Sequence, residues 1–208
     1  MTIERRDFLS GAALLALALG IPVAAVRLSD IADDDMPSPR QRLLARAVSQ
    51  IVIPRTATPG AGEVGVGDFL ILALAHGLDG SREPAASGAT PTGESPPLRR
   101  DGSLDHLVWL ERALDRRSGG DFLGIAPPAR AQMLAALDAE AYPPGPPPAD
   151  PSPWQTIKGL ILTGYYTSQT GAAQELRYEL VPGRFDNDIP LTPGARAWSS
   201  DWTAVEFG

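Results

Sequence analysis

The sequence predicts a mainly α-helical protein: a compact multi-helix domain with long Gly/Pro-rich loops and an extended aromatic C-terminal tail. Apolar residues recur every three to four positions in five separate segments, which is the period of an amphipathic helix. Glycine and proline, 21 residues each, are concentrated between these segments, where they mark turns and connectors. No segment shows the strong apolar and polar alternation of a half-buried strand.

The N-terminal residues have the pattern of an export signal. Adjacent Arg5 and Arg6 are followed by Phe8 and Leu9, which open an uncharged segment over residues 8–26. This arrangement is typical of a twin-arginine signal. By its resemblance to such signals, it implies export of an already folded chain, often with a cofactor or a bound partner.

The fate of this segment stays open between two alternatives. Small residues at 23–25 favour removal by a signal peptidase after Ala25. A retained membrane anchor is the alternative, because residues 8–26 would span about 28 Å as a helix, close to a hydrocarbon core of about 30 Å. Its glycines, proline and many alanines make it a weak membrane span. We therefore expect 1–25 to be a signal peptide and 26–208 to form a single domain.

The charge and the cysteine and histidine content of the chain argue against several classes of function. The chain has a net charge of −7 and no long basic cluster, which argues against a nucleic-acid partner. It has no cysteine, so disulfides, thiolate ligands, iron–sulfur clusters and covalently bound haem are excluded. His76 and His106 are isolated from each other in the sequence, and we interpret both as ordinary helix residues. A metal site is not predicted.

Two helices are expected in the first part of the domain. The first covers 40–53, with apolar residues on one face and Pro54 ending it. Residues 54–62 form a turn rich in proline and glycine. The second helix covers about 64–76 and is apolar on more than one face, so it should be buried.

The middle of the chain alternates between polar connectors and helices. Residues 78–103 are poor in large apolar residues and predict a mobile surface insertion. A helix follows over 104–117, with Ser103 as its expected cap and Gly119-Gly120 as its stop. Another helix is expected over 127–141.

The last helix and the tail follow a rigid connector. Residues 142–153 contain seven prolines in twelve positions and predict an extended spacer. The next helix covers 154–164, and residues 184–208 carry aromatic side chains without helical order. Large rings with polar tips are enriched at protein interfaces. The candidates for partner contacts are Tyr165, Tyr166, Tyr178, Trp198 and Trp202.

Two parts of the chain resemble one known family. Residues 164–172, Gly-Tyr-Tyr-Thr-Ser-Gln-Thr-Gly-Ala, followed by Glu175-Leu-Arg-Tyr178 and Val181-Pro-Gly183, are similar to the signature of the gluconate 2-dehydrogenase subunit 3 family. The segment from Ile53-Pro54 through Val66 and Phe69 resembles an earlier motif of the same family. Gln169-Thr170 departs from the acidic and branched residues expected there, and 78–103 and 142–153 match no family motif.

The resemblance implies a non-catalytic small subunit of a membrane-associated sugar or polyol dehydrogenase. It implies that a large flavoprotein subunit of the glucose–methanol–choline type holds FAD, and that a multihaem cytochrome c accepts the electrons. It further implies that the small subunit carries the flavin subunit through the twin-arginine translocase and stabilises it in the periplasm, at the inner membrane. This chain itself is expected to bind no cofactor.

The residues agree with an accessory role. The chain has one lysine, Lys158, no cysteine and two separated histidines, so a nucleophile and base arrangement has few candidates and no catalytic residue is predicted. The glycines at 60–62 follow no strand and do not predict a dinucleotide loop. The alternative hypothesis is a standalone envelope protein, anchored or soluble, that binds another partner or a ligand.

Overall fold

The computed structural model describes residues 31–84, 96–145, 152–178, 188, 190 and 192–199. Its main elements are five α-helices: α2 (Pro39–Val52), α3 (Val66–Ala75), α4 (His106–Ser118), α5 (Pro127–Ala141) and α6 (Pro153–Tyr166). Short elements are the 3-10 helices η3 (Asp33–Asp35) and η4 (Leu78–Gly80), the π-helix η5 (Gly171–Glu175), and the strands β1 (Leu176–Tyr178) and β2 (Ala197–Ser199). The prediction of a mainly α-helical protein is confirmed.

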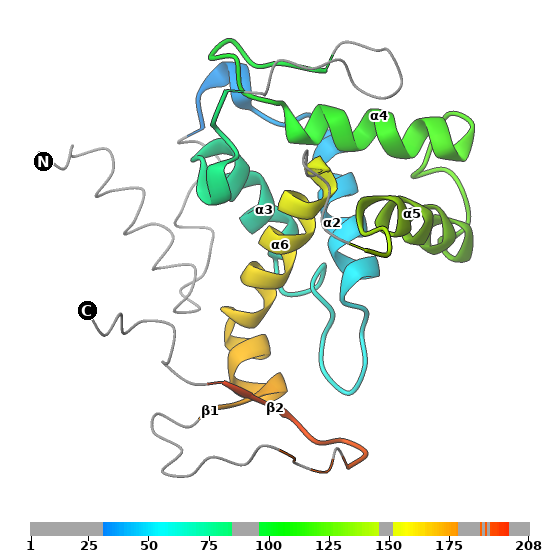
Figure 1. Ribbon diagram of the computed structural model, residues 1–208. Coiled ribbons are helices and arrows are strands. Elements are labelled where there is room, and N and C mark those ends of the chain that lie inside the picture. Colours follow the sequence, from blue (N-terminus) through cyan, green and yellow to red (C-terminus); the bar gives the residue numbers. More distant parts are fainter. Residues whose placement is uncertain are drawn as a thin grey trace, which may run out of the picture.

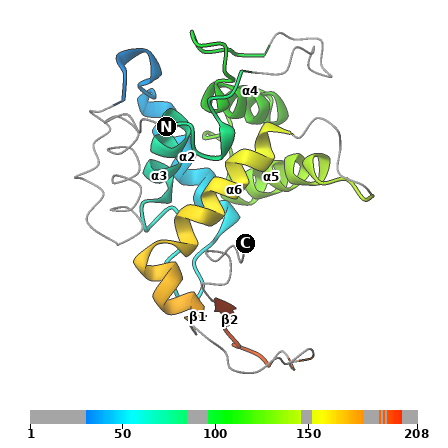
Figure 2. The ribbon, with the colours of Figure 1, turned by 60° about the vertical axis from the view of Figure 1, so that its left-hand side comes forward.

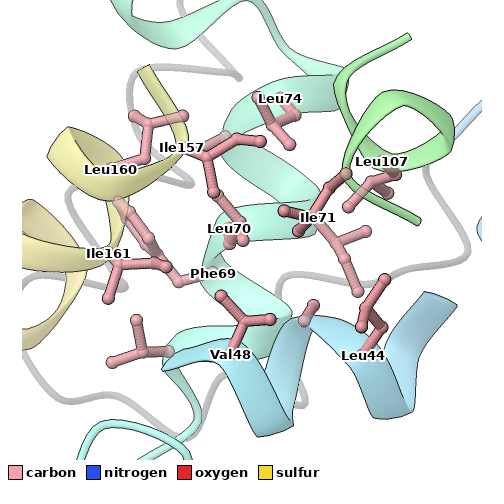
Figure 3. Packing of buried hydrophobic residues seen from close by; sticks show 14 of the residues in the cluster. Leu44, Val48, Phe69, Leu70, Ile71, Leu74, Leu107, Ile157, Leu160 and Ile161 are labelled. Atoms are coloured by element: carbon pink, nitrogen blue, oxygen red, sulfur yellow. The ribbon is translucent and has the colours of Figure 1, made fainter. Parts of the chain in front are cut away.

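Helix α3 packs against both α2 and α6, which lie on two different sides of it (Figure 3). Eight of its ten residues are buried, as the apolar character of all its faces predicts. Leu44 and Val48 of α2 point toward α3 from one side, and Ile157, Leu160 and Ile161 of α6 point toward it from the other (Figure 3). Helices α4 and α5 complete the packing at one end of the molecule, which a second view shows clearly (Figure 2).

The helix ends follow local capping chemistry. Ser38 and Gln41 form a reciprocal capping box at the start of α2, with Pro39 in its first turn. Ser152 caps α6 by accepting a hydrogen bond from the backbone N–H of Trp154. Gly119 ends α4 in a left-handed conformation, φ 77°, which confirms the predicted stop.

The start of α4 corrects the sequence interpretation. The helix begins at His106, and its cap is Asp105, whose carboxylate accepts from the backbone N–H of Val108 at 3.0 Å. The prediction that Ser103 caps a helix starting at Leu104 is therefore wrong. Ser103 is buried and donates its hydroxyl to Asp101 instead, at 2.6 Å.

The segment predicted as a mobile insertion, 78–103, is fixed to the domain at both of its described ends. Two antiparallel bridges join Pro84 with Ser103 and Leu98 with Leu104. Arg82 and Arg99 both bind Asp35, and the Arg99 side chain is only 7% exposed. The prediction of mobility is therefore too broad for 78–84 and 96–103, and residues 85–95 lie outside the described part.

A small parallel sheet follows α6 and was not predicted. Strand β1 pairs with β2 in the register Leu176↔Ala197, Arg177↔Trp198 and Tyr178↔Ser199. The pair lies beyond the C-terminal end of α6 (Figures 1 and 2). Each strand has three residues, too few to show an alternating pattern in the sequence.

Candidate partner-binding surface

The two segments that carry the family resemblance meet at the C-terminal end of α6. The Tyr165 hydroxyl donates a hydrogen bond to the Pro59 carbonyl oxygen at 3.0 Å. The Thr58 hydroxyl donates to the Glu175 carboxylate, 117 residues away in the sequence. The turn after α2 is thus held by the end of α6 and by η5.

Two glycines allow this close packing. A Cβ atom added to Gly164 would lie 2.5 Å from Phe69 Cδ1, inside the buried core. A Cβ atom added to Gly171 would lie 2.0 Å from the Tyr165 carbonyl oxygen. Because real Cβ atoms do not approach other atoms so closely, both positions need glycine for the observed packing.

Tyr165 belongs to the core and not to the exposed surface. It is 1% exposed, and burial raises the pKa of its hydroxyl, which keeps the group protonated as a hydrogen-bond donor. Its prediction as a partner contact is therefore wrong for this residue. The tyrosine stabilises the turn at Pro59 instead.

Tyr166 is placed differently although it is the next residue. It is 40% exposed, and its ring packs edge-on against that of Tyr165 with 5.3 Å between centroids. Leu162, one helical turn earlier on α6, is 38% exposed. These two side chains form an apolar strip on the outer face of α6.

The remaining ring candidates fall into three cases. Trp198 of β2 is 42% exposed, and the Arg177 guanidinium lies over its ring at 4.2 Å. For Tyr178 the structure describes the backbone, in β1, and not the side chain. Trp202 lies outside the described residues. We name the set Leu162, Tyr166, Arg177 and Trp198 the end patch.

The export-signal residues cannot be placed in the fold. Arg5, Arg6, Phe8, Leu9 and the cleavage position Ala25 all lie outside the described residues. Within the described residues, no helix has the length and apolar character needed to cross a bilayer. The export signal stays a prediction.

The two histidines occupy unlike positions. His76 follows the end of α3 and is exposed. His106 is 6% exposed, and its Nδ1 lies 3.1 Å from the Leu104 carbonyl oxygen. Burial, together with the charge of Arg99, lowers the pKa of His106 to about 4. The neutral imidazole therefore stabilises the start of α4 through its contact with the Leu104 carbonyl oxygen.

The single lysine is engaged in joining α5 to α6. Lys158 Nζ lies 2.7 Å and 3.0 Å from the two carboxylate oxygens of Asp138, and 4.6 Å from the centroid of the Tyr142 ring. The Trp154 indole also donates to Asp138, at 2.6 Å. Partial burial opposes ionisation of Asp138, but the hydrogen bonds from Lys158 and Trp154 outweigh it and lower its pKa.

Two arginine centres were not found by sequence reasoning. Arg40, at the start of α2, binds Glu111 and Asp115 of α4 and Asp121 of the following loop, and its hydrogen bond to Asp115 contributes most to raising its pKa. At the other centre, Arg82 and Arg99 share Asp35. The partners lie dozens of residues apart, so no local sequence signal identifies them.

The described residues therefore define a small helical protein in which Arg40, Arg82, Arg99 and Lys158 form ion pairs that join its elements. No cluster of three or more histidine or acidic side chains able to hold a metal ion occurs among them. Among the described residues, exposed rings and large apolar side chains that could contact another molecule occur near the end of α6, as Leu162, Tyr166 and Trp198, and elsewhere, as Leu43, Leu98 and Tyr142.

Comparison with known proteins identifies the family. The family described as gluconate 2-dehydrogenase subunit 3 matches residues 39–183, which include both segments that carry the resemblance. The chain belongs to this family, and the predicted resemblance is confirmed. The family name describes a subunit of a dehydrogenase that has several subunits. Comparisons with curated proteins and with solved structures gave no match.

Proposed function

We propose that this chain is the non-catalytic small subunit of an FAD-dependent sugar or polyol dehydrogenase, and that it escorts the flavin subunit during export and stabilises it. Membership of the gluconate 2-dehydrogenase subunit 3 family supports the role of a subunit. In this proposal the large subunit is of the glucose–methanol–choline type and holds FAD. A multihaem cytochrome c receives the electrons, and the assembly works in the periplasm at the inner membrane.

The observation that carries the non-catalytic role is that two of the three candidate bases, Lys158 and His106, are engaged within the fold, while the third, His76, is exposed. Oxidation of an alcohol requires a base for the hydroxyl proton and an acceptor for the hydride. The Lys158 amine binds Asp138, and the His106 ring is buried against a backbone carbonyl. Both groups stabilise helix contacts and are poorly placed to contact a sugar. The chemistry is therefore assigned to the partner.

The stabilising role rests on the exposed apolar side chains. Tyr166, Trp198 and Leu162 are each more than one third exposed although they are large and apolar. Such side chains near one end of a small domain are typical of a surface that another protein covers. The escort role rests in addition on the paired arginines Arg5 and Arg6.

The test is co-expression of the full-length chain with its flavoprotein subunit, followed by measurement of FAD-bound enzyme in the periplasmic fraction. An Arg5→Lys, Arg6→Lys double variant should abolish delivery of the flavoprotein. The matched control is Arg42→Lys, Arg112→Lys, which makes the same chemical change at two exposed helix positions and should leave delivery unchanged.

Two results would contradict the proposal. Normal delivery of the flavoprotein with the Arg5→Lys, Arg6→Lys variant would end the escort role. Oxidation of a sugar by the purified chain alone, without the flavoprotein, would end the non-catalytic role. In the intact assembly, flavin and haem absorbance should accompany this chain and be absent from the chain purified alone.

A further inference from the structure

The sheet formed by β1 and β2 is unusual in its exposure. Its two strands pair in parallel over three residues each. Arg177, Ala197 and Trp198 are all exposed. Parallel sheets are usually covered by other elements on both faces, and a two-stranded sheet is marginally stable without such cover. The observed pair is therefore incomplete by the usual rules of sheet structure.

Within the described part of the chain, no strand pairs with the outer edge of β2. Among the described elements, the main contact of β2 is β1, while β1 also packs against η5. The residues that lead into β2, 192–196, are exposed. An unpaired strand edge presents free backbone N–H and C=O groups that pair readily with another extended chain. The edge of β2 can accept one more strand.

The side chains around this edge indicate what such a strand would carry. The Trp198 ring lies under the Arg177 guanidinium, and Arg196 precedes the strand. Among the described residues 176–178 and 192–199, these two arginines are the charged side chains, in a chain with a net charge of −7. No carboxylate of the described residues forms an ion pair with either arginine. An incoming segment with acidic and apolar side chains would complement both features.

We propose that the edge of β2, together with the end patch, is the docking site for an extended segment of the flavoprotein subunit, which adds to β2 as a further strand. This inference rests on the proposed function. The segment places an apolar side chain against Trp198 and a carboxylate near Arg177 or Arg196. In this proposal Leu162 and Tyr166, exposed in the last part of α6, extend the apolar contact beyond the sheet.

A second copy of this chain is the other occupant to consider. A two-fold interface between two copies joins the same patch of each copy, so it would bring Arg177 and Arg196 of both into one contact. A segment with acidic residues complements these charges instead, so the flavoprotein is the occupant that the charges favour.

The first experiment maps contacts in the purified assembly of the full chain with the flavoprotein. A photoreactive phenylalanine derivative replaces Trp198 in one variant and Leu43 in another. Leu43 is 61% exposed and lies in the first half of α2. The part of this region that contacts the end of α6 is the turn after α2, at Pro59. Crosslinks to the flavoprotein are expected from position 198 and not from position 43.

Each outcome of this mapping has a distinct meaning. Crosslinks from position 43 alone, in an intact assembly, would overturn the docking site and leave the proposed function standing. Crosslinks from position 198 to a second copy would also overturn it. If no flavoprotein associates with the unmodified chain, the proposed function fails and the docking site fails with it.

The second experiment measures affinity and backbone pairing. Trp198→Ala should weaken binding of the flavoprotein about 30-fold, as expected for a central aromatic contact. Arg177→Glu, Arg196→Glu should weaken it more than Arg42→Glu, Arg112→Glu, which changes the net charge equally. Backbone amides of 197–199 should exchange more slowly in the complex than in the free chain. Unchanged exchange, or equal effects of the two charge variants, would contradict the added strand.

Discussion

Substitution of Gly171 tests whether the close contact between η5 and the end of α6 holds the fold together. In Gly171→Ala the new Cβ atom would lie 2.0 Å from the Tyr165 carbonyl oxygen and 2.7 Å from its carbon. These are backbone atoms, and the same oxygen already accepts hydrogen bonds from the backbone and hydroxyl of Ser168. The contact can be relieved only if the backbone moves. We expect destabilisation of about 3 kcal/mol, the upper part of the range for overpacking.

The matched control is Gly159→Ala in the middle of α6. There the added Cβ atom would lie 3.8 Å from Asp79 Oδ2, an ordinary van der Waals distance. Alanine favours a helix over glycine by about 1 kcal/mol, so this variant should be more stable than the natural chain. The same chemical change should therefore have opposite signs at two positions, with a difference of about 4 kcal/mol.

Thermal unfolding of the full chain, followed by far-ultraviolet circular dichroism, measures the difference. For a protein of this size each kcal/mol shifts the melting temperature by about 2–4 °C, so the two variants should differ by about 8–16 °C. If Gly171→Ala has the same melting temperature as the natural chain, the contact with Tyr165 is not tight. If Gly159→Ala loses as much stability as Gly171→Ala, the effect belongs to glycine in general and the reasoning from contacts fails.

Three further predictions concern single side chains. Tyr165→Phe should lower the free energy of unfolding in urea by about 1 kcal/mol, because it removes the hydrogen bond to Pro59. Tyr166→Phe should leave it almost unchanged, because Tyr166 is exposed. Equal losses would contradict the assignment of Tyr165 to the core. Asp35→Asn should destabilise the chain by about 1.5–3 kcal/mol, because it removes the carboxylate that Arg82 and Arg99 share, and a loss below about 0.5 kcal/mol would refute that role. The pKa of His106 is about 4 in the folded chain, below the ordinary 6.5 of the unfolded one, so the unfolded state takes up a proton first as the pH falls. The free energy of unfolding should therefore drop by about 3 kcal/mol between pH 6.5 and 4. His106→Leu should reduce this pH dependence in unfolding curves measured across that range.

The helices could be predicted because their apolar spacing is a local property of the sequence. The expected segments 40–53, 127–141 and 154–164 agree with α2, α5 and α6 within three residues at each end. The start of α4 was misjudged because Ser103 and Asp105 are both suitable caps, and only tertiary contacts show that Ser103 is committed to Asp101. Competing local signals of equal strength are resolved by the fold and not by the sequence.

The candidate site could be predicted only in part, because its formation depends on contacts across long sequence distances. Tyr165 and Tyr166 are adjacent and identical in type, yet one is buried and the other exposed. The difference comes from the turn at Pro59, which occupies one side of α6 only. The sequence predicts that these two rings take part in packing or binding, but it does not show which ring is buried and which is exposed.

The ion pairs of Asp35 and the parallel sheet were missed for the same reason. Asp35 binds Arg82, 47 residues later, and no spacing rule relates them. Strand β2 has only three residues, a length at which a helical, extended or irregular interpretation fits equally well. Such features become visible when the chain is already folded.

The hydrogen bond between Thr58 and Glu175 has a consequence for the timing of synthesis. The two residues are 117 positions apart, and ribosomes add about 5–20 residues per second, so this contact cannot form until roughly 6–23 s after Thr58 is made. Helix α3 waits nearly as long for the side chains of α6 that cover it. During that interval a nascent chain exposes the most apolar of its described helices to the cytosol, and general chaperones are the proteins expected to meet it first.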